Sequence, residues 1–403
     1  MTYQETINWM FAQLPIYQQK GASALKHKLD NIINFSEELG SSHTQFKSIH
    51  VAGTNGKGSS SHMLASILQE AGYKVGLYTS PHLKDFRERI RINGNPVSEK
   101  FVTEFISANK RFLEANSLSF FEMTVGMAFS YFAKEKVDIA VIEVGLGGRL
   151  DSTNIITPEV SLITNIGYDH MDLLGDTLEK IAMEKAGIMK KGIPVVISER
   201  QKETTGIFQM LAAQKHAELV FAEDEDVQSY PTDLLGEYQR KNIKGVVAAL
   251  RKLKGFDITE EHFEKGLLNV TANTGLLGRW QVLGEKPTIL CDTAHNQEGL
   301  GLVLAQLQKQ EYETLHIVLG FVQDKNIQNL LPLFPEEATY YFVRPNVIRG
   351  LSEEDLKQNA NRLGLRGKMY PSVNDGLAAA KKASKNTDII FIGGSTFVVA
   401  EVL

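Results

Sequence analysis

The chain has 403 residues, of which 43% are hydrophobic and 23% charged, and this length predicts two globular domains rather than one. The net charge of -5 argues against nucleic acid or an anionic membrane as a partner, because the field of the molecule repels both. The single Cys291 argues against a disulfide framework, and the sequence shows neither a signal pattern nor a membrane-length apolar run, so we expect a cytoplasmic protein. We also expect a monomer.

Short apolar runs alternate with longer stretches of helical spacing, which is typical of parallel strands joined by crossover helices. The first series of predicted strands covers residues 48–52, 74–78, 138–144, 160–164 and 194–198. The second series covers residues 288–291, 315–319, 339–343 and 388–392. The sequence therefore predicts an α/β protein, with a P-loop-type domain built on a mostly parallel sheet and then a smaller Rossmann-like α/β domain.

The predicted domain boundary lies in residues 271–278, where small residues and two glycines, Gly275 and Gly278, interrupt the periodicity. This position gives an N-terminal domain of residues 1–272, a linker of residues 273–278 and a C-terminal domain of residues 279–403.

A glycine-rich loop follows the first predicted strand and precedes a segment, 60–70, with helical spacing. Its glycines allow backbone N–H groups to turn toward a phosphate, and the helix N-terminus adds partial positive charge. Lys57 can then reach the β and γ phosphates of ATP, while Ser59 or Ser60 can face Mg²⁺. The predicted nucleotide-binding residues are Gly53, Thr54, Asn55, Gly56, Lys57, Gly58, Ser59 and Ser60.

The spacing of this loop differs from the common GxxxxGK[ST] pattern, because Gly58 separates Lys57 from Ser59. The alternative is a glycine turn that only joins a strand to a helix. The lysine and the hydroxyl groups favour phosphate binding.

Glu143 ends an almost continuously apolar segment, 138–142, as expected for a central parallel strand buried on both faces. The carboxyl ends of such strands are where open α/β sheets bind ligands. A carboxylate is a suitable Mg²⁺ ligand, although a glutamate that caps a strand in solvent is the alternative.

Lys185 falls on the apolar face of a helix predicted to start near Thr177. That face comprises Leu178, Ile181, Ala182, Ile188 and Met189. A lysine in this position either buries its methylene groups and extends its ammonium to the edge, or has a specific role in a site.

These motifs resemble the Mur ligase superfamily, and in particular its folylpolyglutamate synthase and dihydrofolate synthase branch. The resemblance runs from about residue 45 to the C-terminus. It is carried by His50–Ser59, Thr79–Leu83, Arg87–Ile90, Glu143–Asp151, Asp169–His170 with Glu184–Ile188, and Asp292–Asn296.

The resemblance implies roles for individual residues. The metal contacts that it implies are Ser59, Ser80, Glu143 and His170. ATP contacts beyond the loop are Asn242, near the adenine, with Arg279 and Asp292. Substrate contacts are Phe121, Glu122, Asp151, His295 and Ser395, of which His295 and Ser395 lie near the incoming glutamate. The catalytic residues are Lys57, Lys185, His170 and His295, and Lys185 is implied to carry CO₂ as a carbamate.

The implied reaction is an ATP- and Mg²⁺-dependent joining of L-glutamate to a reduced folate or to dihydropteroate through an acyl phosphate. Mur peptide ligases carry an additional nucleotide-sugar domain before the loop, and the 52 residues before Gly53 are too few for it. Phe121 could stack on a pterin or benzoyl ring. The alternatives are a Mur-type ligase acting on another carboxylate, and a P-loop ATPase or nucleotide-binding regulator.

Several positions depart from the usual family pattern. Ala24–His27 stands where Gly-Leu-Glu-Arg is usual, Thr293 replaces the glycine of Gly-Ala-His-Asn, and Asn326 follows Lys325 where aspartate is common. The first difference concerns recognition of the pteroate, and the other two concern the second domain.

Overall fold

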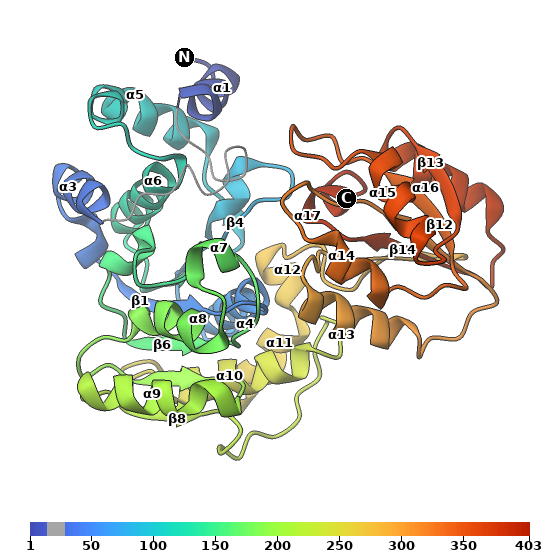
Figure 1. Ribbon diagram of the computed structural model, residues 1–403. Helices are drawn as coiled ribbons and strands as arrows, with labels where there is room; N and C mark the ends of the chain where they lie inside the picture. The colour runs from blue at the N-terminus through green and yellow to red at the C-terminus, as the bar shows by residue number, and fades with distance from the viewer. Residues whose placement is uncertain (14–28) are drawn as a thin grey trace. The chain divides into compact units, whose positions relative to one another are not determined.

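The computed structural model describes residues 1–13 and 29–403, and the chain divides into two compact units (Figure 1). Unit 1 comprises Met1–Asp233 and Gln239–Gly275, and unit 2 comprises Leu234–Tyr238 and Leu276–Leu403. Unit 1 differs from the predicted N-terminal domain of residues 1–272, because residues 234–238 belong to unit 2 and unit 1 continues to Gly275. The Ala24–His27 motif lies outside the described residues.

Unit 1 is built on an eight-stranded sheet with the order β4-β3-β2-β5-β1-β6-β7-β8. The strands from β2 to β8 in this order pair in parallel, whereas β3 pairs antiparallel to both β2 and β4. The strands are β1 Lys47–Ala52, β2 Val75–Tyr78, β3 Ile90–Ile92, β4 Asn95–Pro96, β5 Ile139–Glu143, β6 Val160–Ile163, β7 Val195–Ile197 and β8 Leu219–Phe221.

Helices cover both faces of this sheet, which explains why every residue of β5 and β6 is buried. Helix α4 packs on β1, β2 and β5, and α10 packs on β6 and β7. The helices of unit 1 are α1 Tyr3–Gln13, α3 Asp30–Glu38, α4 Lys57–Glu70, α5 Glu99–Ala115, α6 Phe120–Glu135, α7 Met171–Leu174, α8 Leu178–Lys185, α9 Lys202–Gln214, α10 Gln239–Lys252, α11 Glu260–Leu268 and α12 Val270–Thr274.

Unit 2 contains a six-stranded sheet with the order β13-β12-β11-β14-β10-β9, parallel except for the edge strand β9. The strands are β9 Gln281–Glu285, β10 Thr288–Cys291, β11 Leu315–Leu319, β12 Thr339–Val343, β13 Gly367–Tyr370 and β14 Ile389–Gly393. The helices are α13 Gln297–Leu307, α14 Ile327–Leu330, α15 Glu353–Arg362, α16 Val373–Ala383 and α17 Thr396–Ala400. Two parallel-rich sheets with crossover helices confirm the predicted fold class.

The strands that the sequence did not predict are β3, β4, β8, β9 and β13. Strands β4, β9 and β13 have no buried residue, and β3 and β8 are only three residues long, so none of the five carries a long apolar run. In the part of the chain that the structure describes, no helix is long and apolar enough to cross a membrane.

Candidate functional site

The glycine-rich loop leaves the carboxyl end of β1, and α4 begins within it at Lys57, three residues earlier than the helical spacing had predicted. Two of its glycines lie where no side chain fits. A Cβ on Gly53 would lie 1.8 Å from Thr164 Oγ1, and one on Gly56 would lie 2.3 Å from Asn242 Oδ1. Because Gly58 and Ser59 lie in the first turn of α4, their backbone N–H groups have no carbonyl partner within the helix and can bind an anion.

The loop after β6 holds this glycine-rich loop in shape. The Thr54 N–H donates to the Asn165 carbonyl (2.9 Å), and the Asn55 N–H donates to Asn165 Oδ1 (2.8 Å). The Thr54 hydroxyl accepts from the Gly167 N–H (2.9 Å), and the Thr164 hydroxyl donates to the Asn55 carbonyl (2.6 Å). The side chain of Thr54 therefore braces the loop.

Lys57 and Lys185 both donate to one carbonyl of the loop. Lys57 Nζ lies 3.0 Å from the Gly53 oxygen and 3.0 Å from the Thr54 oxygen, and Lys185 Nζ lies 2.8 Å from the Gly53 oxygen. Lys185 is only 4% exposed. Its burial, and next the nearby Lys57 charge, lower the pKa of Lys185 from 10.5 to about 7. A substantial fraction of its amine is therefore neutral near pH 7.

Helix α8 places Lys185 on its buried face together with Ile181 and Ala182. The predicted apolar face also included Ile188 and Met189, but α8 ends at Lys185 and a 3-10 turn follows. The sequence thus identified the buried lysine although the helix is shorter than its spacing indicated.

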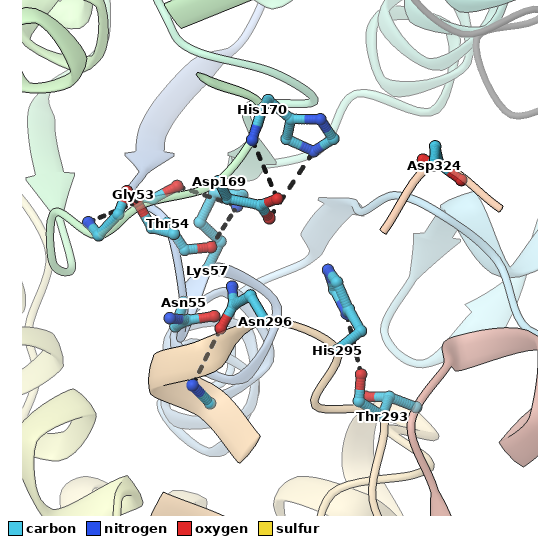
Figure 2. Close-up of polar contacts among 12 residues, drawn as sticks. Gly53, Thr54, Asn55, Lys57, Asp169, His170, Thr293, His295, Asn296 and Asp324 are labelled. Carbon is cyan, nitrogen blue, oxygen red and sulfur yellow. Dashed lines mark hydrogen bonds and ion pairs between the residues drawn. The ribbon is translucent and has the colours of Figure 1, made fainter. Parts of the chain in front are cut away.

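The predicted metal ligands follow strands at the same edge of the unit 1 sheet. The ladder places Glu143 beside Val51, two residues before the loop, and Glu143 Oε2 accepts the Ser80 N–H at 3.2 Å. Ser59 Oγ accepts from Gln239 Nε2 at 3.1 Å. His170 Nε2 lies 3.8 Å from Asp169 Oδ2. Figure 2 draws this ion pair as a dashed line.

These groups suit a hard cation that keeps part of its water shell. Among residues 1–13 and 29–403, no cluster of three or more His, Cys, Asp or Glu side chains could hold a metal by itself. Glu143, 4% exposed, instead supplies a buried carboxylate that contacts the backbone N–H of Ser80, and one such carboxylate fits Mg²⁺ completed by water and phosphate oxygens.

Among the predicted substrate residues of unit 1, the carboxylates have local partners. Glu122 Oε2 accepts the Ser119 N–H (2.6 Å) and completes the capping box of α6. Asp151 accepts from the Leu146 N–H (2.8 Å) and the Thr153 N–H (3.0 Å), and burial raises the pKa of Asp151.

Phe121 packs against the backbone of the loop that follows β5. A Cβ on Gly145 would lie 2.4 Å from Phe121 Cζ, and the Phe121 and Tyr78 ring centroids are 6.2 Å apart. Phe121 is partly buried, so it keeps ring surface for a ligand, whereas Glu122 and Asp151 shape the protein around it.

In unit 2 the predicted residues Asp292, His295 and Ser395 follow the neighbouring strands β10 and β14, whereas Arg279 precedes β9. Asp292, 2% exposed, accepts from the Tyr238 hydroxyl (2.7 Å) and the backbone N–H groups of Trp280 (2.8 Å) and Ala294 (2.8 Å). Burial raises the pKa of Asp292 even though these donors and Arg279 stabilise its charge. Arg279 donates to Thr293 Oγ1 and to the Gly278 carbonyl.

His295 and Ser395 complete the predicted residues of this edge. His295 Nδ1 donates to the Thr293 carbonyl at 3.0 Å, and Asn296 Oδ1 accepts the Gly299 N–H at 2.9 Å at the start of α13 (Figure 2). Ser395 Oγ accepts the Phe397 N–H at 3.2 Å and caps α17.

Sequence reasoning missed Thr164, Asn165, Tyr238 and Gln239. Thr164 and Asn165 could have been found, because Thr164 ends the predicted strand 160–164 that neighbours β1 and Asn165 directly follows it. Tyr238 and Gln239 follow a stretch without apolar periodicity, so only their position before Asn242 could have indicated a role.

Comparisons with known protein families match nearly all of the chain. Residues 51–282 match the model of the Mur ligase middle domain, and residues 278–396 match that of the Mur ligase, glutamate ligase domain. The chain is 32% identical to a dihydrofolate synthase/folylpolyglutamate synthase of Bacillus subtilis, covering 99% of this chain and 98% of that protein.

A probable bifunctional folylpolyglutamate synthase/dihydropteroate synthase of Haloferax volcanii is 31% identical over 100% of this chain. The chain spans 50% of the length of that relative.

Solved structures are similar along the whole chain. The structure of E. coli FolC in complex with DHPP and ADP has a TM-score of 0.88 and 28% identity, covering 100% of this chain and 97% of that chain. A bifunctional folylpolyglutamate synthase/dihydrofolate synthase with Mn, AMPPNP and L-glutamate bound has a TM-score of 0.87 and 27% identity, covering 100% of this chain and 97% of that chain.

Proposed function

The chain belongs to the Mur ligase family, in its folylpolyglutamate synthase and dihydrofolate synthase branch, and we propose that it joins L-glutamate to a folate at the cost of ATP. Membership confirms the family predicted from the motifs, and with it an ATP-dependent ligase. The observation that carries the proposal is the group of Lys57, Lys185 and Glu143 around the glycine-rich loop in unit 1. The acceptor in our proposal is a reduced folate, and dihydropteroate as well.

The residues Gly53–Ser60 are proposed to hold the ATP phosphates. Two observations support this proposal. A side chain at Gly53 or Gly56 would clash with neighbouring atoms, and the first turn of α4 offers backbone N–H groups to an anion. Lys57, which donates to loop carbonyls, would turn its ammonium to the β and γ phosphates. We assign Asn242 to the adenine side because its amide lies against Gly56, and Arg279 and Asp292 to ATP contacts from unit 2.

Ser59, Ser80, Glu143 and His170 are the residues proposed to hold Mg²⁺. A bound magnesium ion would neutralise charge on the phosphates and so let a carboxylate approach them. Glu143 supplies the anionic oxygen, and Ser59 supplies a hydroxyl lone pair beside the phosphates.

Lys185 is proposed to carry a carbamate. Its neutral amine would attack CO₂, forming an N–C bond and releasing one proton, so that a cation becomes an anion with two oxygens. The low pKa of Lys185, about 7, supplies the neutral amine that this step needs. The remaining N–H can keep its bond to the Gly53 carbonyl.

The proposed reaction then follows from what the residues position. The carboxylate of the acceptor attacks the γ phosphorus, ADP leaves, and an acyl phosphate forms. The amine of glutamate, held near His295 and Ser395, attacks the acyl carbon and phosphate leaves. Phe121 would hold the aromatic part of the acceptor. Because reactants held in line gain about 7 to 11 kcal/mol over free ones, most residues here serve to bind and orient.

A panel of acceptors tests the proposal. The full chain is incubated with ATP, Mg²⁺, L-glutamate and either dihydropteroate or a reduced folate monoglutamate, and the products are weighed by mass spectrometry. We expect a mass increase of one glutamate on each acceptor. Glutamate addition to dihydropteroate alone would exclude polyglutamylation of reduced folates. Phosphate release without any acceptor would show that the chain is an ATPase and contradict the ligase function.

We also propose that the chain acts as a cytoplasmic monomer, where ATP and reduced folates are available. Each residue assigned above belongs to one chain, so the proposed site needs no second copy. A light-scattering mass of 44.8 kDa, the mass of one chain, is expected, and a stable dimer would contradict it.

A further inference from the structure

Residues Leu234–Tyr238, here called the strap, form a second connection between the units. The residues on both sides of the strap belong to unit 1, whereas the strap itself belongs to unit 2. The chain therefore passes between the units after Asp233, after Tyr238 and again after Gly275. A single passage would suffice to join two domains, so the strap is an additional covalent link.

Unit 2 holds the strap through its backbone and through Tyr238. The Glu237 N–H donates to Gln306 Oε1 (2.7 Å), and Gln306 Nε2 donates to the Leu235 carbonyl (3.0 Å). The Tyr238 hydroxyl donates to Asp292 Oδ2 (2.7 Å), and the ring packs against the core of unit 2. Burial raises the pKa of Tyr238 well above its usual value, so its hydroxyl remains a donor at neutral pH.

Unit 1 holds the next residue, Gln239, at the phosphate loop. Gln239 is 1% exposed, and its Nε2 donates to Ser59 Oγ at 3.1 Å. Its Oε1 accepts from Asn242 Nδ2 at 2.8 Å, and the Asn242 amide lies against Gly56. Because Ser59 Oγ accepts this bond with one lone pair, its second lone pair stays available for a cation or water.

We propose that Tyr238 and Gln239 are positioning residues that couple the phosphate loop to the loop after Asp292. One peptide bond joins a side chain fixed on Ser59 to a side chain fixed on Asp292. A shift of Ser59 on nucleotide binding therefore moves Gln239 and, through the backbone, Tyr238 and Asp292. This inference rests on the proposed ATP-dependent function and adds a physical route by which unit 2 senses ATP.

A double-mutant cycle in the full chain tests the coupling. The variants are Tyr238→Phe, which keeps the ring and removes the hydroxyl, Gln239→Leu, which removes the amide, and the pair together. Affinity for AMPPNP with Mg²⁺ is measured by calorimetry. Tyr238→Phe removes one hydrogen bond and Gln239→Leu removes two, and each single substitution is expected to weaken binding about 3- to 10-fold. Because both cut the same link, the pair should bind no more weakly than the weaker single variant.

Two matched controls separate coupling from general loss of packing. Tyr230→Phe removes the hydrogen bond from the tyrosine hydroxyl to Glu260 within unit 1. Asn273→Leu removes the hydrogen bond from the asparagine amide to Ser66, which lies on α4, the helix that also carries Ser59. Both should leave AMPPNP affinity within about twofold of the unaltered chain, since neither contact reaches the loop. Hydrogen exchange gives a second readout, in which nucleotide-induced protection of residues 293–300 should disappear in Gln239→Leu.

The outcomes distinguish this inference from the proposed function. If the unaltered chain binds no AMPPNP and forms no amide, the proposed function fails. If it does both, and the effects of Tyr238→Phe and Gln239→Leu on affinity multiply in the pair or match those of the controls, the coupling alone is overturned. Loss of exchange protection with non-multiplying affinities would support the coupling.

Discussion

The charged side chains at the carboxyl edges of the two parallel sheets have different partners. In unit 1, two lysines donate to the one carbonyl of Gly53, and their repulsion contributes to the low pKa of Lys185. In unit 2, the Asp292 carboxylate is held by donors from its own unit, and Asn296 and Ser395 cap helices. The first edge places two lysine side chains on the proposed phosphate loop, whereas the polar groups of the second edge hold its own loops and cap its helices.

Substitution of Lys57 should have the largest effect on activity and tests the role of the unit 1 edge. Replacing Lys57 by Met removes the cation that we propose to meet the transferring phosphate, and the loss of one such stabilising group should lower turnover by about 100- to 1000-fold. Turnover is measured as amide formation under saturating ATP. The control is Lys180→Met, which breaks only the exposed ion pair with Asp176 on α8 and should leave turnover unchanged. Equal turnover in both variants would remove Lys57 from the chemistry.

Burial of Lys185 should make the free energy of unfolding depend on pH. Its pKa falls from 10.5 to about 7 on folding, so between these values the unfolded chain holds more protons than the folded one. The free energy of unfolding should therefore rise with pH by up to about 1.4 kcal/mol per pH unit in this window, and level off below about pH 7. Urea unfolding in CO₂-free buffer at pH 7, 8 and 9 measures the slope.

The variant Lys185→Met should flatten this slope, because it removes the group whose pKa changes. CO₂-free buffer is needed because carbamate formation would consume the neutral amine. Lys180→Met is the control, because Lys180 is exposed and forms a surface ion pair with Asp176, and this variant should keep the slope of the unaltered chain. If Lys185→Met keeps the slope of the unaltered chain, the low pKa of Lys185 is wrong.

Much of both edges could be predicted from the sequence, for a physical reason. Buried parallel strands read as continuous apolar runs, so β1, β5 and β10 were found, and each polar motif that follows them was placed at a carboxyl end. Lys185 was found because one charge on an apolar helix face is conspicuous. These signals are local along the chain.

What the sequence could not predict depends on distant partners. Glu122 and Asp151 look like free carboxylates in a motif, yet Ser119 and Leu146 already bind them. The strap falls inside the predicted first domain, because nothing near it in the sequence indicates its contacts with Gln306, far along the chain. Such contacts leave no periodic pattern near the residue concerned.

A matched pair of carboxylates sharpens the contrast between the edges. Asp292→Asn places amide hydrogens against backbone donors and should lower the free energy of unfolding of unit 2 by about 1 to 3 kcal/mol. Glu143→Gln can still accept the Ser80 N–H, so it should change stability less while weakening Mg²⁺-dependent nucleotide binding. Urea unfolding and AMPPNP calorimetry with and without Mg²⁺ measure both. The reverse pattern would exchange the roles of the two edges.

The smallest predicted effect concerns two helical glycines with open space around them, one in each unit. A Cβ on Gly206 in α9, or on Gly301 in α13, would meet no atom within 4 Å. Alanine at either position should therefore stabilise its unit by about 0.5 to 1 kcal/mol, because glycine loses more backbone entropy on folding. Differential scanning calorimetry follows both variants. If the units unfold separately, Gly206→Ala raises the melting temperature of unit 1 and Gly301→Ala raises that of unit 2. If either variant shifts a single shared transition, the two units unfold as one cooperative structure.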